Sequence, residues 1–579
     1  MRAKFRTTLL LTLSLFLIIA LAACGGSKDD KSTSDDSGKT ETSATDKADT
    51  SADTGSKEET SPYKDKYDPP VTITTVWGVD PALKFKNGET IENNVATKWA
   101  KDTLGIDIKS LWSVTNTNNA YSTKLRLALT SGQELPDVLV VGNEDPQLIQ
   151  DLIDSGAFQD AGALFDKYAN DTWKSAMALD PNNWNTYVRD GVRMAIPILD
   201  YAYNNDYLLW IRQDWLDKLN LQAPKTIDEL ETVMEAFKNN NPSGLAPDKV
   251  VPLSIGFKSS MNTWMGDPSW IFGAYGTIPQ QWNVGADGKL EYGSVNAGMK
   301  QGLQKLNEWY NKGFIPKEAA LWDENKTSEP AVAGTAGIIP GPYWMSGWPL
   351  QDTVKNDPAA VWKPIALPTG PDGKAGRHGT AFNNGVILIN KDMKNPEAFF
   401  TYENYMFSNL ADPQPGGPFE NGLFKGYDYE LDANGQAVYG DDNVPGGVVN
   451  AVRYLLVRDG ARIPDAQMKA LLNLADGKEP TTRMEKDLKN NFGKETPAAA
   501  VALMAQKDAG FMNMYTGPST ETMKTKFDYL KKIEAQTFNE IIYGEKSADE
   551  FDKFVATWKS SGGDQITTEV NTWYDGINK

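Results

Sequence analysis

Two kinds of apolar segment alternate between Val71 and Gly156, and this alternation restricts the fold class more than any other feature of the 579-residue chain. Runs rich in β-branched residues, VTITTVW from Val71 and VLVV from Val138, predict strands. Between them, apolar residues three or four positions apart predict helices that end at glycines. Alternating strands and helices are typical of a parallel, doubly wound sheet with helices on both faces. The expected fold class is therefore α/β.

Polar and aromatic residues follow the predicted strands. Trp77 ends the first strand, and Asn143, Glu144 and Asp145 come just after the strand that begins at Val138. In doubly wound sheets, ligands bind beyond the carboxyl ends of the strands, so these four residues are candidate ligand-binding residues. Glu144 and Asp145 have a second interpretation, as a solvated helix start that the helix dipole stabilises.

The first 23 residues have the parts of a signal peptide. Arg2, Lys4 and Arg6 precede an apolar stretch that is shorter than the ~20 residues of a membrane-spanning helix. The tetrapeptide LAAC at 21–24 resembles the bacterial lipobox, in which the thiol is alkylated with diacylglycerol and the chain is cut before it. We therefore expect Cys24 to anchor the chain at the extracellular face of the cell membrane. The only cysteine of the chain cannot form an internal disulfide, and the alternative is an ordinary signal peptide with an incidental cysteine.

The composition changes abruptly after Cys24. Ser, Thr, Asp, Lys and Gly dominate, so we expect residues 24–67 to form a disordered tether, with the folded region beginning at Asp68. The rest of the chain is longer than the ~250–300 residues that one hydrophobic core serves. Two or more lobes are therefore expected.

Charge and composition exclude several functions. The formal net charge of −19 becomes −22 when the three basic residues leave with the signal peptide, whereas nucleic-acid binding needs a basic face. One histidine and one cysteine leave few ligands for zinc, haem or iron-sulfur clusters, and no GxxxxGK[ST] motif is present for ATP. We therefore expect no nucleic-acid partner, no metal and no cofactor. His378, in AGRHGTAFNNG, is expected to be a solvated loop residue rather than the base of a catalytic triad.

Five stretches together carry a family resemblance. They are LALTSGQELPDVLVV, IRQDWLDKLNLQAPKTIDELETVMEAFK, LNEWYNKGFIPKE, GTAGIIPGPYW and GGDQITTEVNTWY. With these stretches in this order behind a lipobox, the chain resembles the extracellular solute-binding lipoproteins of bacterial ABC importers, in the oligosaccharide-binding group. The resemblance extends from about Val71 to the C-terminus.

The resemblance implies two doubly wound lobes joined by a hinge, as in type II periplasmic binding proteins. On this basis we expect lobe 1 to comprise 68–205 and 378–505, and lobe 2 to comprise 206–377 and 506–579. The chain would cross between the lobes near Asn205 and near His378.

The resemblance also implies a function without catalysis. A carbohydrate, most simply an oligosaccharide, would bind in the cleft of a monomeric protein and be delivered to the subunits of an ABC permease. Two alternatives remain open on the sequence. A secreted glycoside hydrolase would need two carboxylates at a set separation, which the many acidic residues could supply. A ligand-sensing lipoprotein could relay the same closure to a membrane sensor.

Aromatic rings suit the apolar faces of a pyranose, and polar side chains suit its hydroxyls. In the family, the aromatic residue after the Gly-Pro turn often faces the cleft, which here is Tyr343. Asp206 is added because it precedes the strand-like run YLLWI near the expected hinge. Four further candidates are chosen from their loop context, and each could equally be core: Trp264, Trp270, Trp344 and Trp348.

Some family members carry a calcium loop just after the helix that here ends at Phe237. In this chain the corresponding segment, NNNPSGLAPDKV, offers mostly amides and one late carboxylate, Asp248. Calcium prefers 6–8 oxygen ligands with carboxylates among them. We therefore expect no calcium ion there.

Overall fold

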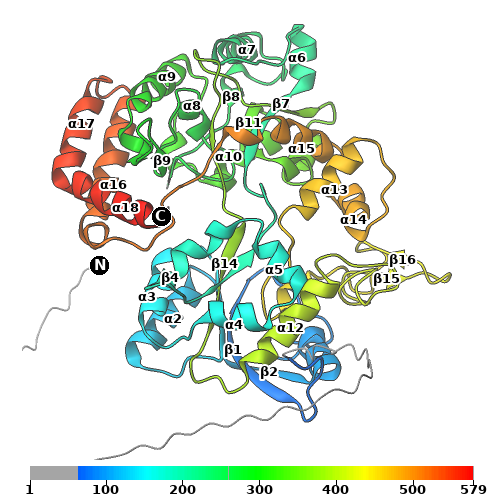
Figure 1. The fold of residues 1–579 in the computed structure, drawn as a ribbon. Coiled ribbons are helices and arrows are strands. Elements are labelled where there is room, and N and C mark those ends of the chain that lie inside the picture. Colours follow the sequence, from blue (N-terminus) through cyan, green and yellow to red (C-terminus); the bar gives the residue numbers. More distant parts are fainter. Residues whose placement is uncertain (1–62, 259, 578–579) are drawn as a thin grey trace, which may run out of the picture. The chain divides into compact units, whose positions relative to one another are not determined.

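The computed structural model describes residues 63–258 and 260–577, so the expected signal peptide, Cys24 and nearly all of the expected tether lie outside the described residues. The described part belongs to one compact unit. It consists of two lobes (Figure 1), and each cluster of buried apolar side chains in the described residues draws on one lobe alone. Each lobe thus has hydrophobic clusters of its own, as lobes that move about a hinge require.

Lobe 1 is built on five strands, β1 (Val71–Val79), β2 (Ile106–Thr115), β3 (Val138–Val141), β6 (Ile196–Leu199) and β14 (Asn383–Ile389). β1 and β2 pair in parallel, as the sequence predicts. β14 lies between β3 and β6 and is antiparallel to both, so the expectation of a wholly parallel sheet is wrong. The physical reason is that β14 carries the chain back into lobe 1 from lobe 2, against the direction in which β6 leaves.

Helices cover both faces of the three-stranded sheet β3–β14–β6, as expected. Alternate side chains of β14 enter different cores: Val386 and Leu388 pack with α2 and α3, whereas Ile387 and Ile389 pack with α4, α5 and α12. The helices are α1 (Val95–Trp99), α2 (Ala120–Ser131), α3 (Pro146–Asp154), α4 (Ala161–Tyr168), α5 (Asp171–Met177) and α12 (Pro396–Asn409). Short hairpins are formed by β4 (Val188–Arg189) with β5 (Val192–Arg193) and by β15 (Glu430–Leu431) with β16 (Ala437–Val438).

Lobe 2 has a four-stranded sheet in the order β12 (Trp362–Ile365), β7 (Tyr207–Arg212), β11 (Ala336–Pro342) and β8 (Val251–Leu253). β7 is the strand by which the chain enters this lobe, and it too is antiparallel to both neighbours. All six residues of β7 are buried. They alternate between two cores, with Leu209 and Ile211 in one and Leu208 and Trp210 in the other.

The helices of lobe 2 pack on both faces of this sheet and extend beyond it. They are α6 (Gln213–Leu219), α7 (Ile227–Asn240), α8 (Ser269–Gly273), α9 (Gly298–Lys312), α10 (Glu324–Val332), α11 (Thr353–Asn356), α13 (Ala466–Ala475), α14 (Arg483–Asn491), α15 (Thr496–Ala505), α16 (Glu521–Ile542), α17 (Glu550–Trp558) and α18 (Asp564–Ile577). The minor strands are β9 (Trp282–Val284), β10 (Leu290–Tyr292), β13 (Arg377–His378) and β17 (Gly510–Phe511). None of the described helices combines the length and apolar character that crossing a membrane demands.

The expected division of the chain needs one correction. It placed residues 378–505 in lobe 1, but α13 packs on α15, and α15 packs on β7 and β12 of lobe 2. The reason is that the apolar side chains of these helices, Leu471 and Leu503 among them, are buried in one cluster with Trp210.

The chain therefore passes between the lobes three times, at residues 200–206, 379–382 and 457–465. These connections are bonded to one another. The Asp200 amide donates to the Phe382 carbonyl at 2.9 Å, and the Ala202 amide donates to the Pro464 carbonyl at 2.7 Å. Arg462 forms an ion pair with the buried carboxylate of Asp200. The three connections thus form one hydrogen-bonded hinge region.

Candidate functional site

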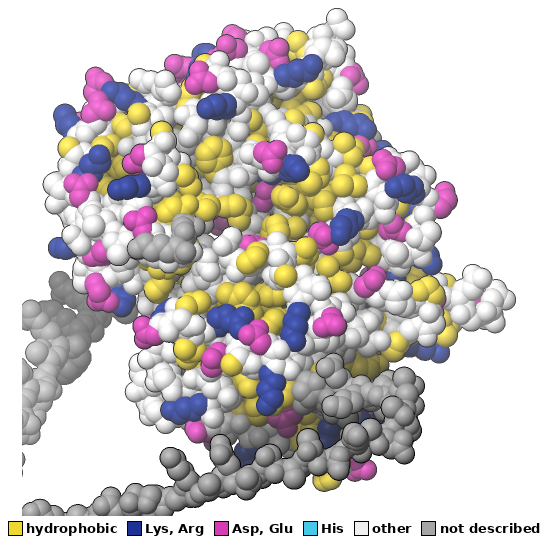
Figure 2. Space-filling model, in the orientation of Figure 1, with side chains coloured by type: hydrophobic (Ala, Val, Ile, Leu, Met, Phe, Trp, Pro, Cys, Tyr) yellow, Lys and Arg dark blue, Asp and Glu magenta, His cyan; other side chains and the backbone are white. Residues whose placement is uncertain are grey.

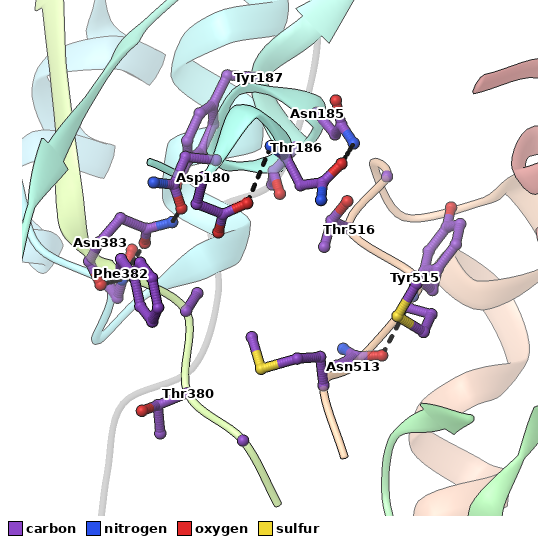
Figure 3. A pocket seen from close by; sticks show the side chains of 18 of the residues that line it. Asp180, Asn185, Thr186, Tyr187, Thr380, Phe382, Asn383, Asn513, Tyr515 and Thr516 are labelled. Carbon is purple, nitrogen blue, oxygen red and sulfur yellow. Dashed lines mark hydrogen bonds between the residues drawn. The ribbon is translucent and has the colours of Figure 1, made fainter. Parts of the chain in front are cut away.

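A cavity of about 750 Å³ lies where the two lobes face each other. Lobe 1 contributes the start of α3, the 3₁₀ helix Pro181–Tyr187 and the start of β14. Lobe 2 contributes residues 507–517 and the end of α18, and the hinge connections lie between the two walls. Figure 3 shows Asp180, Asn185, Thr186 and Tyr187 on one side of the cavity and Asn513, Tyr515 and Thr516 on the other.

Amide side chains dominate the polar lining. They are Asn143, Gln150, Asn182, Asn183, Asn185, Asn383 and Asn513. Each amide offers hydrogen-bond donors and an acceptor, which matches a hydroxyl group because a hydroxyl both donates and accepts. The lining therefore suits a ligand that carries many hydroxyls.

The amides of lobe 1 hold one another in place. The Asn143 side chain donates to Asn383 Oδ1 at 2.9 Å, and the Asn383 side chain donates to Asn183 Oδ1 at 3.2 Å. Asp180 starts the 3₁₀ helix by accepting from the Asn182 backbone amide at 3.1 Å. The Nδ2 of Asn183 is buried and has no hydrogen-bond partner among the described residues.

In lobe 2, backbone contacts orient Asn513. Its Oδ1 accepts from the backbone amides of Trp282 at 3.0 Å and Tyr515 at 3.3 Å. These contacts fix the side chain at the cavity wall, and its Nδ2 is not used by either of them.

Five aromatic residues line the cavity: Tyr187, Tyr203, Phe382, Tyr515 and Tyr574. The rings of Tyr203 and Phe382 lie 5.9 Å apart at the hinge. Burial raises the pKa of Tyr515 to about 12, so this hydroxyl stays protonated and donates to the Pro518 carbonyl. These tyrosine and phenylalanine rings could stack on the apolar face of a sugar, and no tryptophan is among the residues that line this cavity.

Few charges reach the cavity, and the charged lining residues are Asp180, Asp206 and Lys507. Asp206 is 2% exposed and is neutralised by Arg377, whose Nε lies 2.9 Å from Oδ2. The Thr380 hydroxyl also donates to Asp206, at 2.7 Å. The cavity therefore carries little net charge.

Apolar side chains are also exposed at the cavity. Leu179 of lobe 1 is 45% exposed, and Met512 and Ile577 of lobe 2 are 38% and 44% exposed. In Figure 2, hydrophobic side chains gather in a band where the lobes meet, with charged side chains scattered over the outer parts. Closing of the lobes would remove this surface from water.

The structure separates the candidates named from the sequence. Asn143 and Asp206 line the large cavity. Trp270 and Tyr343 are 1% and 0% exposed and belong to the cores of lobe 2, so placing their rings in the cleft is wrong. The physical reason is that each ring completes an apolar cluster; Trp270, for example, lies 6.1 Å from Trp309.

Three of the tryptophan candidates contact one another on lobe 2, but none of them lines the cavity: Trp264, Trp344 and Trp348. Trp348 stacks on Trp264 at 6.2 Å and on Trp344 at 6.3 Å. The Trp344 indole donates to the Asn204 carbonyl at 2.7 Å, and Trp348 is 46% exposed. The three indoles use one another as stacking partners on lobe 2.

The acidic candidates after β3 have different roles. Asp145 caps α3 by accepting from the Leu148 amide at 3.1 Å, and it pairs with Arg126 at 2.7 Å. For Asp145 the structure therefore agrees with the second interpretation, that of a residue that stabilises the start of a helix. Glu144 lies 3.2 Å from Arg458 and, with Trp77, lines a second and smaller pocket.

His378 is not the solvated loop residue that the sequence suggests. It lies in β13 with 12% of its side chain exposed, and its Nδ1 lies 3.1 Å from Oδ2 of the fully buried Asp267. The ring also packs on Tyr207 at 5.3 Å. It is a packing residue of lobe 2 because Asp267 and Tyr207 take it out of solvent.

The segment compared with a calcium loop is closed by its own hydrogen bonds. The Asn241 side chain donates to the Leu245 carbonyl, and the Ser243 hydroxyl donates to Asn241 Oδ1 at 2.6 Å. Within residues 63–258 and 260–577, no group of three or more His, Cys, Asp or Glu side chains is placed to hold a metal ion.

Sequence reasoning missed most of the lining. Many of the missed residues lie in three short segments, PNNWNTY, AFNNG and MNMYTG, each of which combines asparagine with an aromatic residue, and others, such as Gln150, Tyr203 and Tyr574, lie outside them. That combination was the available signal. The expectation from the sequence rests mainly on tryptophan as the marker of a sugar site, and no tryptophan is among the residues that line this cavity.

The chain is similar to several known proteins. The family model described as bacterial extracellular solute-binding protein matches residues 84–411. The fructooligosaccharide ABC transporter substrate-binding protein FusA of Streptococcus pneumoniae is 27% identical over 317 residues, which are 52% of this chain and 56% of that protein. Lipoprotein LipO of Bacillus subtilis is 24% identical over 487 residues, which are 81% of this chain and 86% of that protein. The match thus spans little more than half of the first relative and most of the second.

A solved structure shows the same fold. An HMO-binding, ABC-transporter-associated solute-binding protein from Bifidobacterium longum infantis has a TM-score of 0.63 at 17% identity, covering 87% of this chain and 99% of that chain. At this identity the likeness supports the two-lobed fold alone.

Proposed function

Because the chain belongs to the bacterial extracellular solute-binding protein family, we propose that it captures an oligosaccharide in the cleft between its lobes and delivers it to an ABC permease. The observation that carries this proposal is the cavity of about 750 Å³ lined by amides and aromatic rings from both lobes. Its volume is in the range of ~300–1,000 Å³ typical of small-molecule sites. The names of FusA and of the HMO-binding protein support a carbohydrate as the ligand class.

The charge of the lining supports a neutral saccharide over an acidic one. A uronic acid brings a carboxylate that needs an arginine or lysine in the site. Here Arg377 is already paired with Asp206, and the remaining charged lining residues, Asp180 and Lys507, are of opposite sign. An anionic sugar would therefore find no uncompensated cationic cluster.

Membrane anchoring through Cys24 completes the proposal. The lipobox at 21–24 supports it, and so does the name of the relative LipO, a lipoprotein. A diacylglyceryl group would hold the protein at the extracellular face, near the permease.

We infer that the protein binds without catalysis. Glycoside hydrolysis needs two carboxylates beside the scissile bond, one of them free to give or take a proton. Of the two carboxylates that line the cavity, Asp206 is buried in an ion pair and receives the Thr380 hydroxyl. This arrangement does not supply a second free carboxylate beside Asp180.

A thermal-shift screen tests the function. Neutral oligosaccharides such as kestose, maltotriose and human-milk oligosaccharides, together with trigalacturonate, are added to the purified chain. Ligand binding to the native state raises the melting temperature. We expect a neutral oligosaccharide to stabilise the protein and trigalacturonate to leave it unchanged.

The same samples distinguish binding from hydrolysis. After prolonged incubation, the sugars that stabilise the protein are assayed for new reducing ends. Stabilisation with no new reducing ends supports a binding protein. New reducing ends that disappear in Asp180→Asn would instead assign a hydrolase.

A further inference from the structure

The most exposed methionine of the described residues lies at the binding cavity. Met512 directly follows β17, lines the cavity and is 38% exposed. Every other methionine within residues 63–258 and 260–577 is buried or only partly exposed. Because an oxidant must reach the thioether sulfur, exposure selects which methionine reacts first. Met512 is therefore the methionine that is most open to an oxidant in solution.

No thiol of the described residues competes for that oxidant. The only cysteine of the chain is Cys24, which lies before the described part and is expected to carry the lipid. Cysteine thiols and methionine thioethers are the side chains whose first oxidation step is readily reversed. A reversible response of the two lobes to an oxidant therefore depends on methionine.

The Met512 side chain packs against the hinge. A Cβ at Gly379 would lie 2.5 Å from the Met512 sulfur, so the thioether uses the room that a glycine leaves. The Gly379 amide donates to the Phe511 carbonyl at 2.8 Å, next to the parallel pairing of β13 with β17. Gly379 begins one of the three connections between the lobes. The Met512 thioether thus joins the cavity wall of lobe 2 to a hinge connection.

Oxidation of Met512 changes the chemistry of this contact. A sulfoxide places a polar oxygen on what was an apolar side chain. Leu179 of lobe 1 and Ile577 of lobe 2, the other exposed aliphatic side chains of the cavity, offer that oxygen no hydrogen-bond donor. Burying a polar group without a hydrogen bond is unfavourable, so the sulfoxide is drawn towards solvent and away from Gly379. Closure of the lobes, which would enclose Met512 with these side chains, becomes less favourable for the same reason.

We propose that Met512 is a reversible oxidation site, at which hydrogen peroxide loosens the hinge and weakens the capture of the ligand. The sulfur gives an electron pair to one oxygen of the peroxide, an S–O bond forms as the O–O bond breaks, and the second oxygen leaves as water. The sulfur is oxidised by two electrons and the peroxide is reduced by two. A methionine sulfoxide reductase reverses the step: two thiols become a disulfide, and the oxygen leaves as water. The effect on ligand capture rests on the proposed function, whereas the oxidation and its effect on the hinge do not.

Mass spectrometry tests which methionine reacts. The purified full-length chain is treated with a limiting amount of hydrogen peroxide, and fragmentation of its peptides locates the added oxygen. Met512 should be oxidised about tenfold faster than Met484, which is half-buried on α14 and does not line the cavity. Met512→Leu, which keeps an apolar side chain of similar volume, should lack the fast reaction.

Hydrogen–deuterium exchange measures the hinge without any ligand. After oxidation, the parent chain should exchange the amides of residues 379–382 about tenfold faster, because the packing that protects the hydrogen bond of the Gly379 amide is lost. Met512→Leu, treated with peroxide in the same way, should exchange them as it does untreated. Met484→Leu is the matched control and should respond as the parent chain does. Methionine sulfoxide reductases A and B, with dithiothreitol, should restore slow exchange in the oxidised parent.

Calorimetry with kestose, maltotriose and human-milk oligosaccharides measures capture of the ligand. An oligosaccharide that binds the untreated parent chain should bind the oxidised parent about tenfold more weakly, because closure now buries an unpaired polar oxygen. Treatment with the two reductases should restore the affinity. Peroxide should leave the affinity of Met512→Leu at its own untreated value.

Each outcome decides between this inference and the proposed function. If other described methionines react before Met512, or if peroxide changes the exchange of residues 379–382 in neither chain or equally in Met512→Leu, the oxidation site is overturned, even when an oligosaccharide binds. Equal affinity before and after oxidation of the parent chain would overturn the effect on ligand capture. If exchange responds through Met512 while none of the sugars binds, the proposed function is contradicted and the oxidation site is supported.

Discussion

Two glutamates lie in the lobe interiors, Glu403 of α12 and Glu534 of α16, at 2% and 0% exposed. Burial raises the pKa of Glu403 to about 8 and that of Glu534 to about 7. Glu534 accepts a hydrogen bond from Gln280 at 2.9 Å, which offsets part of the effect of burial. Both carboxyl groups are neutral in the folded protein at mildly acidic pH.

Glu403→Gln should remove a pH dependence of stability. The folded pKa lies above the unfolded value, so the folded state binds the proton more tightly, and stability falls as the pH rises from about 4.5 to 8. Glu403 should account for a loss of up to about 4 kcal/mol over this range in the parent chain, and the variant should lack this contribution and keep only the smaller one from Glu534. Urea unfolding at pH 5 and pH 8 measures the difference. Glu479→Gln, at a side chain 88% exposed, is the control, and an equal pH dependence in parent and Glu403→Gln would contradict the prediction.

Phe382 and Trp270 should respond in opposite ways to truncation. Phe382 lines the cavity and is partly exposed, so Phe382→Ala should weaken binding of the oligosaccharide found in the screen by about thirtyfold, or about 2 kcal/mol, with the fold intact. Trp270 fills a core, so Trp270→Ala should cost about 3–5 kcal/mol of stability. Calorimetric affinity and melting temperature on both variants check this. If Trp270→Ala is stable but no longer binds the oligosaccharide, Trp270 is a ligand-binding residue and this prediction is wrong.

At the scale of elements, periodicity in the sequence predicted what each segment forms but not its direction in the sheet. VTITTVW and VLVV are strands, as predicted. The run YLLWI is equally apolar in a parallel and in an antiparallel strand, because burial on both faces, not direction, sets its pattern. The antiparallel directions of β7 and β14 come from the hinge connections, which join residues far apart in the sequence.

The residues of the candidate site are harder to predict from the sequence than the strands are, because most of them come together from segments that are far apart in the chain. Asn143 can be predicted as a lining residue because it follows the end of a strand, and a strand end is recognisable from neighbouring residues in the sequence. Asn183 and Asn513 line the same cavity only because the fold brings the 3₁₀ helix of lobe 1 near a C-terminal segment of lobe 2. Trp270 and Tyr343 illustrate the converse, since a loop-like sequence context does not distinguish a core ring from a cleft ring.

The helix α18 should matter for both stability and binding. Ile566 and Val570 are fully buried against lobe 2, whereas Tyr574 and Ile577 line the cavity. Removal of residues 564–579 should cost about 3–6 kcal/mol of stability, from the two buried aliphatic side chains alone, and should weaken ligand binding. Urea unfolding and calorimetry measure the two effects. Tyr574→Ala is the companion variant, which should weaken binding with a smaller loss of stability; unchanged binding in both variants would exclude α18 from the site.

At the scale of the whole molecule, the expected motion is closure of the lobes about the three connections. Closure should bring Leu179 of lobe 1 toward Met512 and Ile577 of lobe 2 and bury their exposed surface. Small-angle scattering should show a smaller radius of gyration when the oligosaccharide found in the screen is bound. The measurement is made at saturation, with binding confirmed by calorimetry. An unchanged radius under those conditions would contradict a hinge mechanism.

The proposed lipid anchor leads to a prediction for the full-length protein. Cys24→Ser removes the thiol that would carry the diacylglyceryl group, so the chain should remain an uncleaved precursor or become soluble. Detergent phase partitioning of cells that express each form measures this. A serine variant that still partitions with the membrane at the mature size would contradict the anchor.

The interleaving of the two lobes along the sequence has a consequence for the folding rate. β14 lies in the middle of the lobe 1 sheet, yet the segment from β7 to β13 of lobe 2 separates it from β6. Lobe 1 therefore cannot complete its sheet until most of lobe 2 has been synthesised, and α13–α18 of lobe 2 come later still. Contacts between residues so distant in sequence slow folding, because the entropy of closing long loops is lost before the contacts form. A newly made chain with this topology stays unfolded for longer, and an unfolded chain is the form that can be threaded across a membrane.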